Sequence, residues 1–298
     1  MHISSHSIRT ASMPLGMIVG ALLCRPIVAL DTLCSGMLTP VMICTLLFFT
    51  FCRVDVRKMR PTMMHLWLMV AQIACSIIIY LILRPFGDTI AQGGMICALA
   101  PVAMAAVVIG GMLGAKVETM VTYSLICNVV TAFVAPVMLS QVGSGECSLW
   151  QILAKVAPLL VVPFVAGQLC RVLLPNVAAW FASHSRLSFY IWLASLAVIM
   201  GRTTAFIIDY GTEHIDEEIA LAAVAGVICI VQFSLGRYIG SRYGDIVAGG
   251  QSLGQKNTVL AVWMAQSFLN PLSCIAPTAY IVWQNIVNSY QLHKQKDL

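Results

Sequence analysis

The 298-residue chain has few charged side chains, since Asp, Glu, Lys and Arg together make up only 10% of it. Soluble domains contain roughly a quarter charged residues, so this composition cannot provide a water-facing surface for a protein of 32.3 kDa. The shortage excludes a soluble enzyme, a nucleic-acid-binding protein and a disordered scaffold. In its place the chain has 59% apolar residues and a mean hydropathy of +0.89, which is typical of a polytopic membrane protein.

Several signatures of site chemistry are missing as well. The eleven cysteines are dispersed without any Cys-x-x-Cys pair, which argues against a disulfide framework or a metal site. No histidine lies at the centre of an apolar run, and no Asp or Glu lies in the core of one. Neither glycine-rich nucleotide-binding motif occurs, so nothing supports an ATP-driven pump. We expect no enzymatic activity and no resident cofactor.

Ten apolar segments remain when the chain is divided at charged and turn-forming residues. Each is a candidate membrane-spanning helix, so we expect an all-α polytopic membrane protein with ten transmembrane helices. Residues 1–12 and 291–298 would form the two termini, and 141–149 an external loop. The ten segments are 13–30, 37–52, 64–83, 90–113, 117–140, 150–173, 187–208, 217–240, 244–268 and 272–290.

The basic residues predict how the chain crosses the membrane. With the N-terminus in the cytoplasm, twelve of them fall in cytoplasmic loops and three in external ones. Membrane proteins carry such an excess on the cytoplasmic side, so we expect both termini there, with the protein in the plasma (inner) membrane. The cytoplasmic twelve are Arg9, Arg53, Arg57, Lys58, Arg60, Lys116, Arg171, Arg186, Arg237, Arg242, Lys294 and Lys296. The external three are Arg25, Arg84 and Arg202.

The ten segments divide into two groups of five. The first segment of each group starts near residues 13 and 150, and the last ends near 140 and 290, offsets close to half the chain length. Because five is odd, a second copy would enter the membrane upside down, as inverted repeats of secondary transporters do. We therefore expect one repeat over 13–140 and a second, inverted one over 150–290.

The fourth segment of each group is interrupted near its middle. Ala100-Pro101-Val102 interrupts the first, where proline removes a hydrogen bond and clashes with the preceding turn. The run 249–257 places three glycines and a cluster of polar side chains in the second. Such backbone is tolerated at this depth only against a cavity or other protein, and a matched pair of interrupted segments indicates a transporter's binding site. Alternatively, Pro101 only kinks a packed helix.

Lys256 is the most informative single residue, because an ammonium at the bilayer centre costs roughly 3 kcal/mol on insertion scales. An uncompensated cation there suits an organic anion. Alternatively, Lys256 snorkels to one surface or ties the crossing helices together. Its candidate partners are opened carbonyls and the side chains of Gln72, Ser124, Asn128, Gln232, Gln255 and Asn257.

Other intramembrane polar residues have two readings. Gln72, Ser124 and Asn128 could line the same cavity as Lys256, or could serve contacts between helices. Near the end of the last segment, polar side chains are expected to reach the cytoplasmic interface. These are Gln284, Asn285 and Asn288.

The run Gln251-Ser-Leu-Gly-Gln-Lys-Asn-Thr-Val-Leu-Ala261 resembles the ninth-helix signature of the bile acid:sodium symporter family, whose members read Glu-Thr-Gly-x-Gln-Asn-x-x-Leu-Ala. Ala100-Pro101 lies where the family has Cys-Pro before its broken fourth helix, and Phe48-Phe49-Thr50-Phe51 lies at the end of the second helix. The similarity in length, helix count and topology covers nearly the whole chain. The matching signature residues are Gly254, Asn257, Leu260 and Ala261.

The resemblance implies a panel domain of helices 1, 2, 6 and 7 and a core domain of helices 3–5 and 8–10. Helices 4 and 9 would cross at their breaks. Substrate would bind between the two domains, and rocking of one against the other would give alternating access.

The chain departs from the family at its sodium ligands. A Ser-Asn pair that holds sodium in the family falls on Ala106 and Val107, whose side chains offer no oxygen to a hard cation. The ninth-helix Glu falls on Ser252 and its Gln on Lys256, whereas a third-helix Gln is kept as Gln72. Our hypothesis is that the Lys256 ammonium replaces a sodium ion, held by Gln72 and nearby carbonyls, as a fixed charge or a proton carrier. A one-residue shift of the alignment would instead restore Gln255 to the sodium-ligand position.

These observations predict a secondary transporter that moves an organic anion, such as a bile acid or a carboxylate, and that needs no sodium if Lys256 replaces the ion. The alternatives are a sodium- or proton-independent facilitator or exporter resembling auxin-efflux carriers, and a non-transporting membrane scaffold. The expected partners are the anionic substrate and the lipid bilayer, with no nucleic acid. The expected binding residues are Lys256, Asn257, Gln255, Ser252, Gln72, Ser124, Asn128, Pro101 and Gly254.

Overall fold

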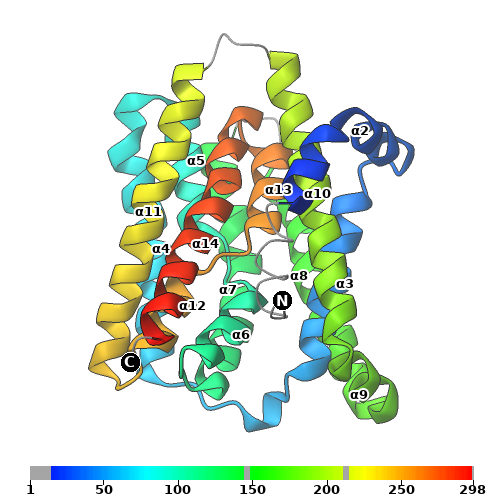
Figure 1. Ribbon diagram of the computed structural model, residues 1–298, viewed down its shortest axis with the longest axis vertical. Coiled ribbons are helices and arrows are strands. Elements are labelled where there is room, and N and C mark those ends of the chain that lie inside the picture. The colour runs from blue at the N-terminus through cyan, green and yellow to red at the C-terminus, as the bar shows by residue number, and fades with distance from the viewer. Residues whose placement is uncertain (1–14, 144–147, 211–214, 297–298) are drawn as a thin grey trace, which may run out of the picture. The chain divides into compact units, whose positions relative to one another are not determined.

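The computed structural model describes residues 15–143, 148–210 and 215–296, and in these ranges the chain forms helices and no strand (Figure 1). The expected cytoplasmic N-terminus, 1–12, lies outside the described residues, as do parts of the external loop 141–149 and of the C-terminus 291–298. A first helix, Leu15–Leu22, is followed by α2 (Cys24–Leu33), α3 (Leu38–Arg53), α4 (Met63–Leu83), α5 (Asp88–Leu99), α6 (Met104–Met112), α7 (Val117–Val142), α8 (Leu149–Leu173), α9 (Pro175–Ser183), α10 (Ser185–Tyr210), α11 (Ile215–Arg242), α12 (Ile246–Gly254), α13 (Thr258–Phe268) and α14 (Ile275–Lys296). Short 3₁₀ turns are η1 (Val56–Lys58), η2 (Arg84–Phe86) and η4 (Pro271–Cys274).

Five helices are long and apolar enough to cross a membrane, which identifies a membrane-embedded protein. The number rises to six if Leu15–Leu22 and α2, which meet at a bend of 75°, count as one span. The other predicted segments do not pass this test: α3, α5, α6, α12 and α13 are short, and the 22-residue α14 is long enough but not apolar enough. The five long spans are Met63–Phe86, Val117–Val142, Leu149–Leu173, Leu187–Asp209 and Ile215–Arg242.

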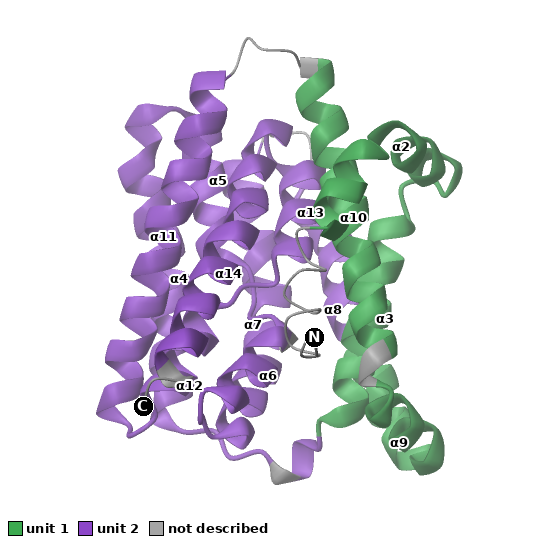
Figure 2. Cartoon of the chain, in the orientation of Figure 1, with its two compact units in different colours: residues 1–54, 162–214 green, residues 55–161, 215–298 purple. Residues whose placement is uncertain are grey.

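The chain folds into two compact units, coloured separately in Figure 2. Unit 1 contains residues 1–54 and 162–214, and unit 2 contains residues 55–161 and 215–298. Helix α8 begins in unit 2 and ends in unit 1. Each half of the chain therefore contributes to both units.

Unit 1 is held together by polar contacts from α8 to the end of α3. The Gln168 amide donates to the carbonyls of Phe51 and Val54, each at 3.0 Å, and the Arg171 guanidinium donates to the Cys52 carbonyl at 2.9 Å. These carbonyls belong to the last turn of α3, where a helix leaves its acceptors without partners of its own. Side chains of α8 therefore cap α3.

A partly buried ion pair in unit 1 involves a carboxylate that directly follows the first apolar segment, 13–30. Asp31 in α2 is 7% exposed, and its carboxylate lies 3.2 Å from the guanidinium of Arg202 in α10. Arg202, which was counted among the external basic residues, lies within the predicted segment 187–208 and is helical. The sequence did not reveal the pair because the two residues lie in different halves of the chain and meet only through folding.

In unit 2, α11 packs extensively on α12 and α14, and Figure 1 shows these three helices grouped together. Glycines let the backbones of α11 and α12 approach closely. A Cβ atom at Gly249 would lie 2.2 Å from the Gly236 carbonyl oxygen and 2.7 Å from the Gly240 Cα. The predicted interruption at 249–257 is confirmed in its last part, because α12 continues to Gly254 and the break occupies 255–257. Gly249 itself lies within the helix. The role of these glycines is close packing between helices.

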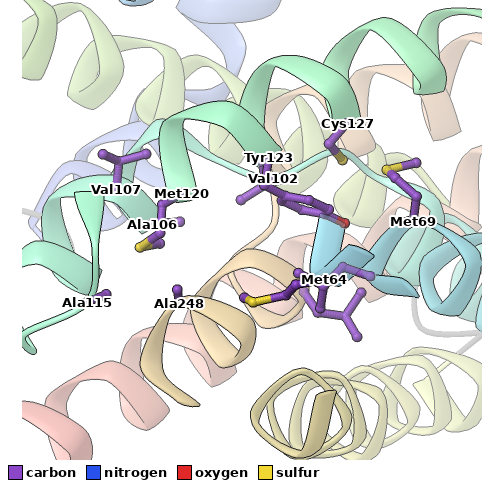
Figure 3. Packing of buried hydrophobic residues seen from close by; sticks show 12 residues of the cluster. Met64, Met69, Val102, Ala106, Val107, Ala115, Met120, Tyr123, Cys127 and Ala248 are labelled. Atoms are coloured by element: carbon purple, nitrogen blue, oxygen red, sulfur yellow. The ribbon is translucent and has the colours of Figure 1, made fainter. Parts of the chain in front are cut away.

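A hydrophobic cluster in unit 2 joins α4, α6, α7 and α12, and Figure 3 shows its side chains converging from these helices. Tyr123 lies at its centre and is fully buried. One member, Val102, lies between α5 and α6. Its members are Met64, Leu68, Met69, Val102, Ala106, Val107, Ala115, Met120, Tyr123, Cys127, Ala248 and Leu253.

The close contact between α11 and α12 generates a prediction about two neighbouring glycines. Gly249→Ala forces a methyl group against backbone that cannot move aside, so we expect it to lower the free energy of unfolding by about 1–3 kcal/mol. Gly250→Ala is the matched control, because its new methyl group would meet mainly the flexible side chain of Arg237. Thermal unfolding of the purified variants in detergent measures both. Equal midpoints for the two variants would contradict the packing argument.

Candidate functional site

The candidate site lies in unit 2, where two apolar segments are each broken into a pair of short helices, α5 with α6 and α12 with α13. The first break separates α5 from α6 at residues 100–103. Ala100 has an extended backbone (φ −50°, ψ 137°), as expected for a residue before proline. The second break separates α12 from α13 at residues 255–257, and there the side chain of Asn257 caps α13 by accepting a hydrogen bond from Leu260 N.

The two breaks pair with each other as a short antiparallel bridge between Val102 and Lys256. Ala103 N donates to the Gln255 carbonyl at 2.9 Å, and Asn257 N donates to the Pro101 carbonyl at 2.8 Å. Exchanging positions 102 and 256 exchanges these two hydrogen bonds, so the local pairing has two-fold symmetry. Each break thus satisfies backbone groups that the other leaves open.

The Lys256 side chain is 1% exposed and binds the carbonyl end of α5. Its Nζ donates to the Ala98 carbonyl oxygen at 2.8 Å. The last carbonyls of a helix lack intrahelical partners and carry the negative end of the helix dipole. A cation is therefore favoured at this position, although the partner that the structure shows is a neutral carbonyl rather than a carboxylate.

Gln72 of α4 binds the same helix end. Its amide nitrogen donates to the carbonyls of Leu99 and Ala100 at 3.0 and 3.4 Å. Its side-chain oxygen accepts from the Tyr123 hydroxyl at 3.1 Å. The structure thus brings Gln72 and Lys256 to successive carbonyls at one helix end. Lys256 donates to the Ala98 carbonyl, and Gln72 donates to the next two carbonyls along the chain.

Amide side chains of α14 hold the second break from the opposite side. Gln284 Oε1 accepts from the backbone N–H of Lys256 at 3.0 Å, and the Asn288 amide donates to the Gln255 side-chain oxygen at 2.6 Å. Gln251 in turn donates to the Asn288 side-chain oxygen at 2.9 Å. The expectation that Gln284 and Asn288 reach the interface is wrong, because both are buried against the break. A buried amide is favoured inside the protein when it forms hydrogen bonds to groups that would otherwise lack a partner.

The remaining residues of the second interrupted segment have packing and backbone roles. Gly254 ends α12 against the ring of Phe233, which a Cβ atom at this position would meet at 2.3 Å. Its carbonyl accepts from the Tyr280 hydroxyl at 2.8 Å. Ser252 lies in the last turn of α12 and is buried.

Ser124 and Asn128 lie on α7 and are buried. The Asn128 amide donates to the Ser124 carbonyl of its own helix at 2.7 Å, and the Asn128 side-chain oxygen has no hydrogen-bond partner in the described part of the chain. The contact of α7 with the breaks runs instead through Tyr123 and Cys127, whose side chains both donate to the Gln72 side-chain oxygen.

The positions that the resemblance links to sodium, Ala106 and Val107, lie in α6 within the hydrophobic cluster (Figure 3). Their neighbours there include Met120 and Tyr123. This is an apolar environment, in which a bare cation would have no oxygen ligand from these two side chains. Among the described residues, no three His, Cys, Asp or Glu side chains gather as a metal site.

Sequence reasoning missed three side chains at the breaks. Tyr123 precedes the predicted Ser124, and Tyr280 lies one turn before Gln284, but neither tyrosine differs in pattern from an ordinary packing aromatic. Gln284 carried the only signal, an amide inside the last apolar segment. Its contact with Lys256 depends on how α14 packs beside α12, which the sequence pattern does not specify.

Neither a protein-family model nor a curated protein matches the chain.

The contact between Gln284 and the Lys256 backbone generates a prediction. Gln284→Leu leaves the buried Lys256 N–H without its acceptor, so we expect a loss of about 1–3 kcal/mol in the free energy of unfolding. Asn285→Leu is the matched control, because the Asn285 amide donates to the Ile281 carbonyl of its own helix and its loss should change stability little. Denaturation of both proteins in detergent gives the comparison. A Gln284→Leu variant as stable as Asn285→Leu would refute the assigned contact.

Proposed function

We propose that this chain is a secondary transporter that moves an organic anion by alternating access, with the Lys256 ammonium in the place of a coupling sodium ion. One observation carries the proposal: a buried ammonium binds the carbonyl end of a broken helix, 2.8 Å from Ala98 O, where two broken helices meet. In transporters, half-helix carbonyl ends coordinate the coupling cation. A lysine in that position supplies the charge permanently.

The charge of the breaks supports an anionic substrate. α6 and α13 both begin there, and the N-terminal end of a helix carries partial positive charge that favours anions. Lys256 adds a full positive charge, which its neutral partner does not cancel. A carboxylate or sulfate group is the complement of such a region.

The arrangement of the helices supports ten spans in two inverted repeats. Four further elements, added to the six spans identified by length and composition, would give ten. They are α3, the pair α5–α6, the pair α12–α13, and α14. With ten spans, the first half of the chain gives two to unit 1 and three to unit 2. The second half follows the same order, with α8 shared between the units. The bridge between Val102 and Lys256 pairs the fourth segment of the first half with the fourth segment of the second half, as inverted repeats would.

We also propose a relation to the bile acid:sodium symporter family, with unit 1 as the panel domain and unit 2 as the core domain. The unit boundaries at 54/55 and 214/215 fall between the segments that the resemblance separates. The boundary inside α8 leaves residues 149–161 with unit 2. The excess of basic residues in alternate loops supports cytoplasmic termini in the plasma membrane.

Transport by the purified protein tests the proposal. Proteoliposomes should take up a labelled bile acid or a small labelled carboxylate at the same rate in sodium and in potassium buffer, because Lys256 already fills the cation's place. A pH gradient is varied separately to detect coupling to protons. Steep sodium dependence would overturn the replacement of sodium by Lys256.

Two lysine variants provide the matched comparison for this uptake. Lys256→Met removes the charge between the broken helices and should abolish uptake. Lys155→Met removes the other lysine that lies within an apolar segment. The Lys155 ammonium lies 5.9 Å from the centre of the Phe268 ring, and exposed cation–π contacts of this kind are worth about 0.5–1 kcal/mol. This variant should therefore keep its uptake within about twofold of wild type. Equal activity of the two variants would assign Lys256 to helix packing alone.

A further inference from the structure

The imidazole of His65 lies in the first turn of α4, is 2% exposed and bonds through both of its nitrogens. Nδ1 accepts from the backbone N–H of Thr62 at 2.8 Å and lies 3.0 Å from the Thr62 hydroxyl. Together, Thr62 and His65 form a capping box at the start of α4. Nε2 lies 3.0 Å from the carbonyl oxygen of Thr119 in α7. One ring therefore caps α4 and fastens it to α7.

The two backbone partners fix the protonation state of this ring. A backbone N–H can only donate a hydrogen bond and a carbonyl oxygen can only accept one, so Nδ1 carries no proton and Nε2 carries the single proton. An imidazolium has N–H groups at both nitrogens and cannot accept. It would direct one of them at the Thr62 N–H, and it would add charge to the positive end of the α4 dipole. The two bonds therefore require a neutral ring.

The hydrogen bonds of the ring go to Thr62 and Thr119, and no carboxylate bonds to it among the described residues. Asp245, which is buried, accepts instead from the backbone N–H groups of Lys116 and Ala248 at 3.0 and 2.9 Å. Cations outnumber carboxylates in the surroundings, which therefore do not favour an imidazolium. The charged groups at this end of the elements around α4 are Asp55, Arg57, Arg60, Lys116, Glu118, Arg237, Arg242 and Asp245.

The same ring lies next to side chains that hold the first break. The rings of His65 and Tyr123 are nearly parallel, at 18°, with centroids 6.4 Å apart. The Tyr123 hydroxyl donates to the side-chain oxygen of Gln72, which follows His65 by two turns of α4 and binds the carbonyl end of α5. A change in how α4 is fastened to α7 at His65 would therefore act on Tyr123 and Gln72.

We propose that His65 is a pH-sensitive contact within unit 2, which joins α4 to α7 while its ring is neutral and releases them when the ring binds a proton. The unfolded chain binds that proton without losing a hydrogen bond, so acid shifts the equilibrium towards unfolding. The stabilisation is complete above about pH 6.5, the usual pKa of a histidine, and is lost progressively below it. Because the contact involves only α4 and α7, it does not depend on transport.

Denaturant titration of the purified protein in detergent, at about pH 8 and about pH 5.5, tests the proposal. His65→Gln is the informative variant, because glutamine at this position of a capping box also accepts from the Thr62 N–H and does not titrate. Between the two pH values the folding equilibrium constant of the wild type should fall about tenfold more than that of His65→Gln, since a histidine of ordinary pKa is about tenfold more protonated than neutral one unit below it. An equal fall in both proteins would overturn the proposal.

His184→Gln is the matched control. His184 is exposed, and its Nδ1 lies 2.7 Å from the Trp180 carbonyl oxygen, a bond that a protonated ring keeps. This variant should therefore show the pH dependence of the wild type. A pH dependence that is lost in His184→Gln rather than in His65→Gln would place the titrating group in unit 1 and contradict the proposal.

Hydrogen exchange of the wild type keeps the proposal testable if His65→Gln does not fold. Amide protection at the start of α4, corrected for the intrinsic effect of pH on exchange, should fall on acidification, whereas protection in the middle of α11 should not. Protection at the start of α4 that is the same at both pH values would refute a release of this contact by acid.

Discussion

The structure of unit 2 depends on one constraint, that backbone polar groups opened inside an apolar protein must find partners. Breaking a helix at Pro101 and another after Gly254 exposes carbonyls and N–H groups that water cannot reach. The two breaks meet this demand largely by pairing with each other, through Ala103 N with Gln255 O and Asn257 N with Pro101 O. Side chains then supply the partners that the pairing leaves out.

The identity of these side chains gives the breaks their chemistry. At the end of α5, Gln72 and Lys256 donate to carbonyls that form the negative end of the helix dipole. Of these two donors, only Lys256 carries a full charge. Val102, which pairs with Lys256, is apolar and belongs to the hydrophobic cluster. Two positions related by the local two-fold pairing therefore differ by one charge. That asymmetry is the physical basis for proposing a fixed cation where a transporter would bind a mobile one.

The sequence was informative where a residue type has one physical consequence. Pro101 breaks a helix, and a lysine in an apolar segment requires a polar partner, so the first break and the importance of Lys256 followed from the residues. The sequence failed where the outcome depends on packing between distant segments. Gly249 looked like part of a helix break but lies within α12, where it allows close backbone contact with α11. Gln284 and Asn288 looked interfacial but are buried. The pairing of Asp31 with Arg202 likewise depends on contacts between the two halves of the chain.

The central claim is that the Lys256 ammonium occupies the place of a cation at the carbonyl end of α5. The most direct measurement is the unfolding midpoint of wild type and of Lys256→Gln as sodium chloride replaces choline chloride at constant ionic strength. The account predicts that sodium raises the midpoint of Lys256→Gln and leaves the wild type unchanged, because removal of the ammonium opens oxygen ligands to the ion. A wild type that sodium stabilises, or a folded variant without any response to sodium, would contradict it.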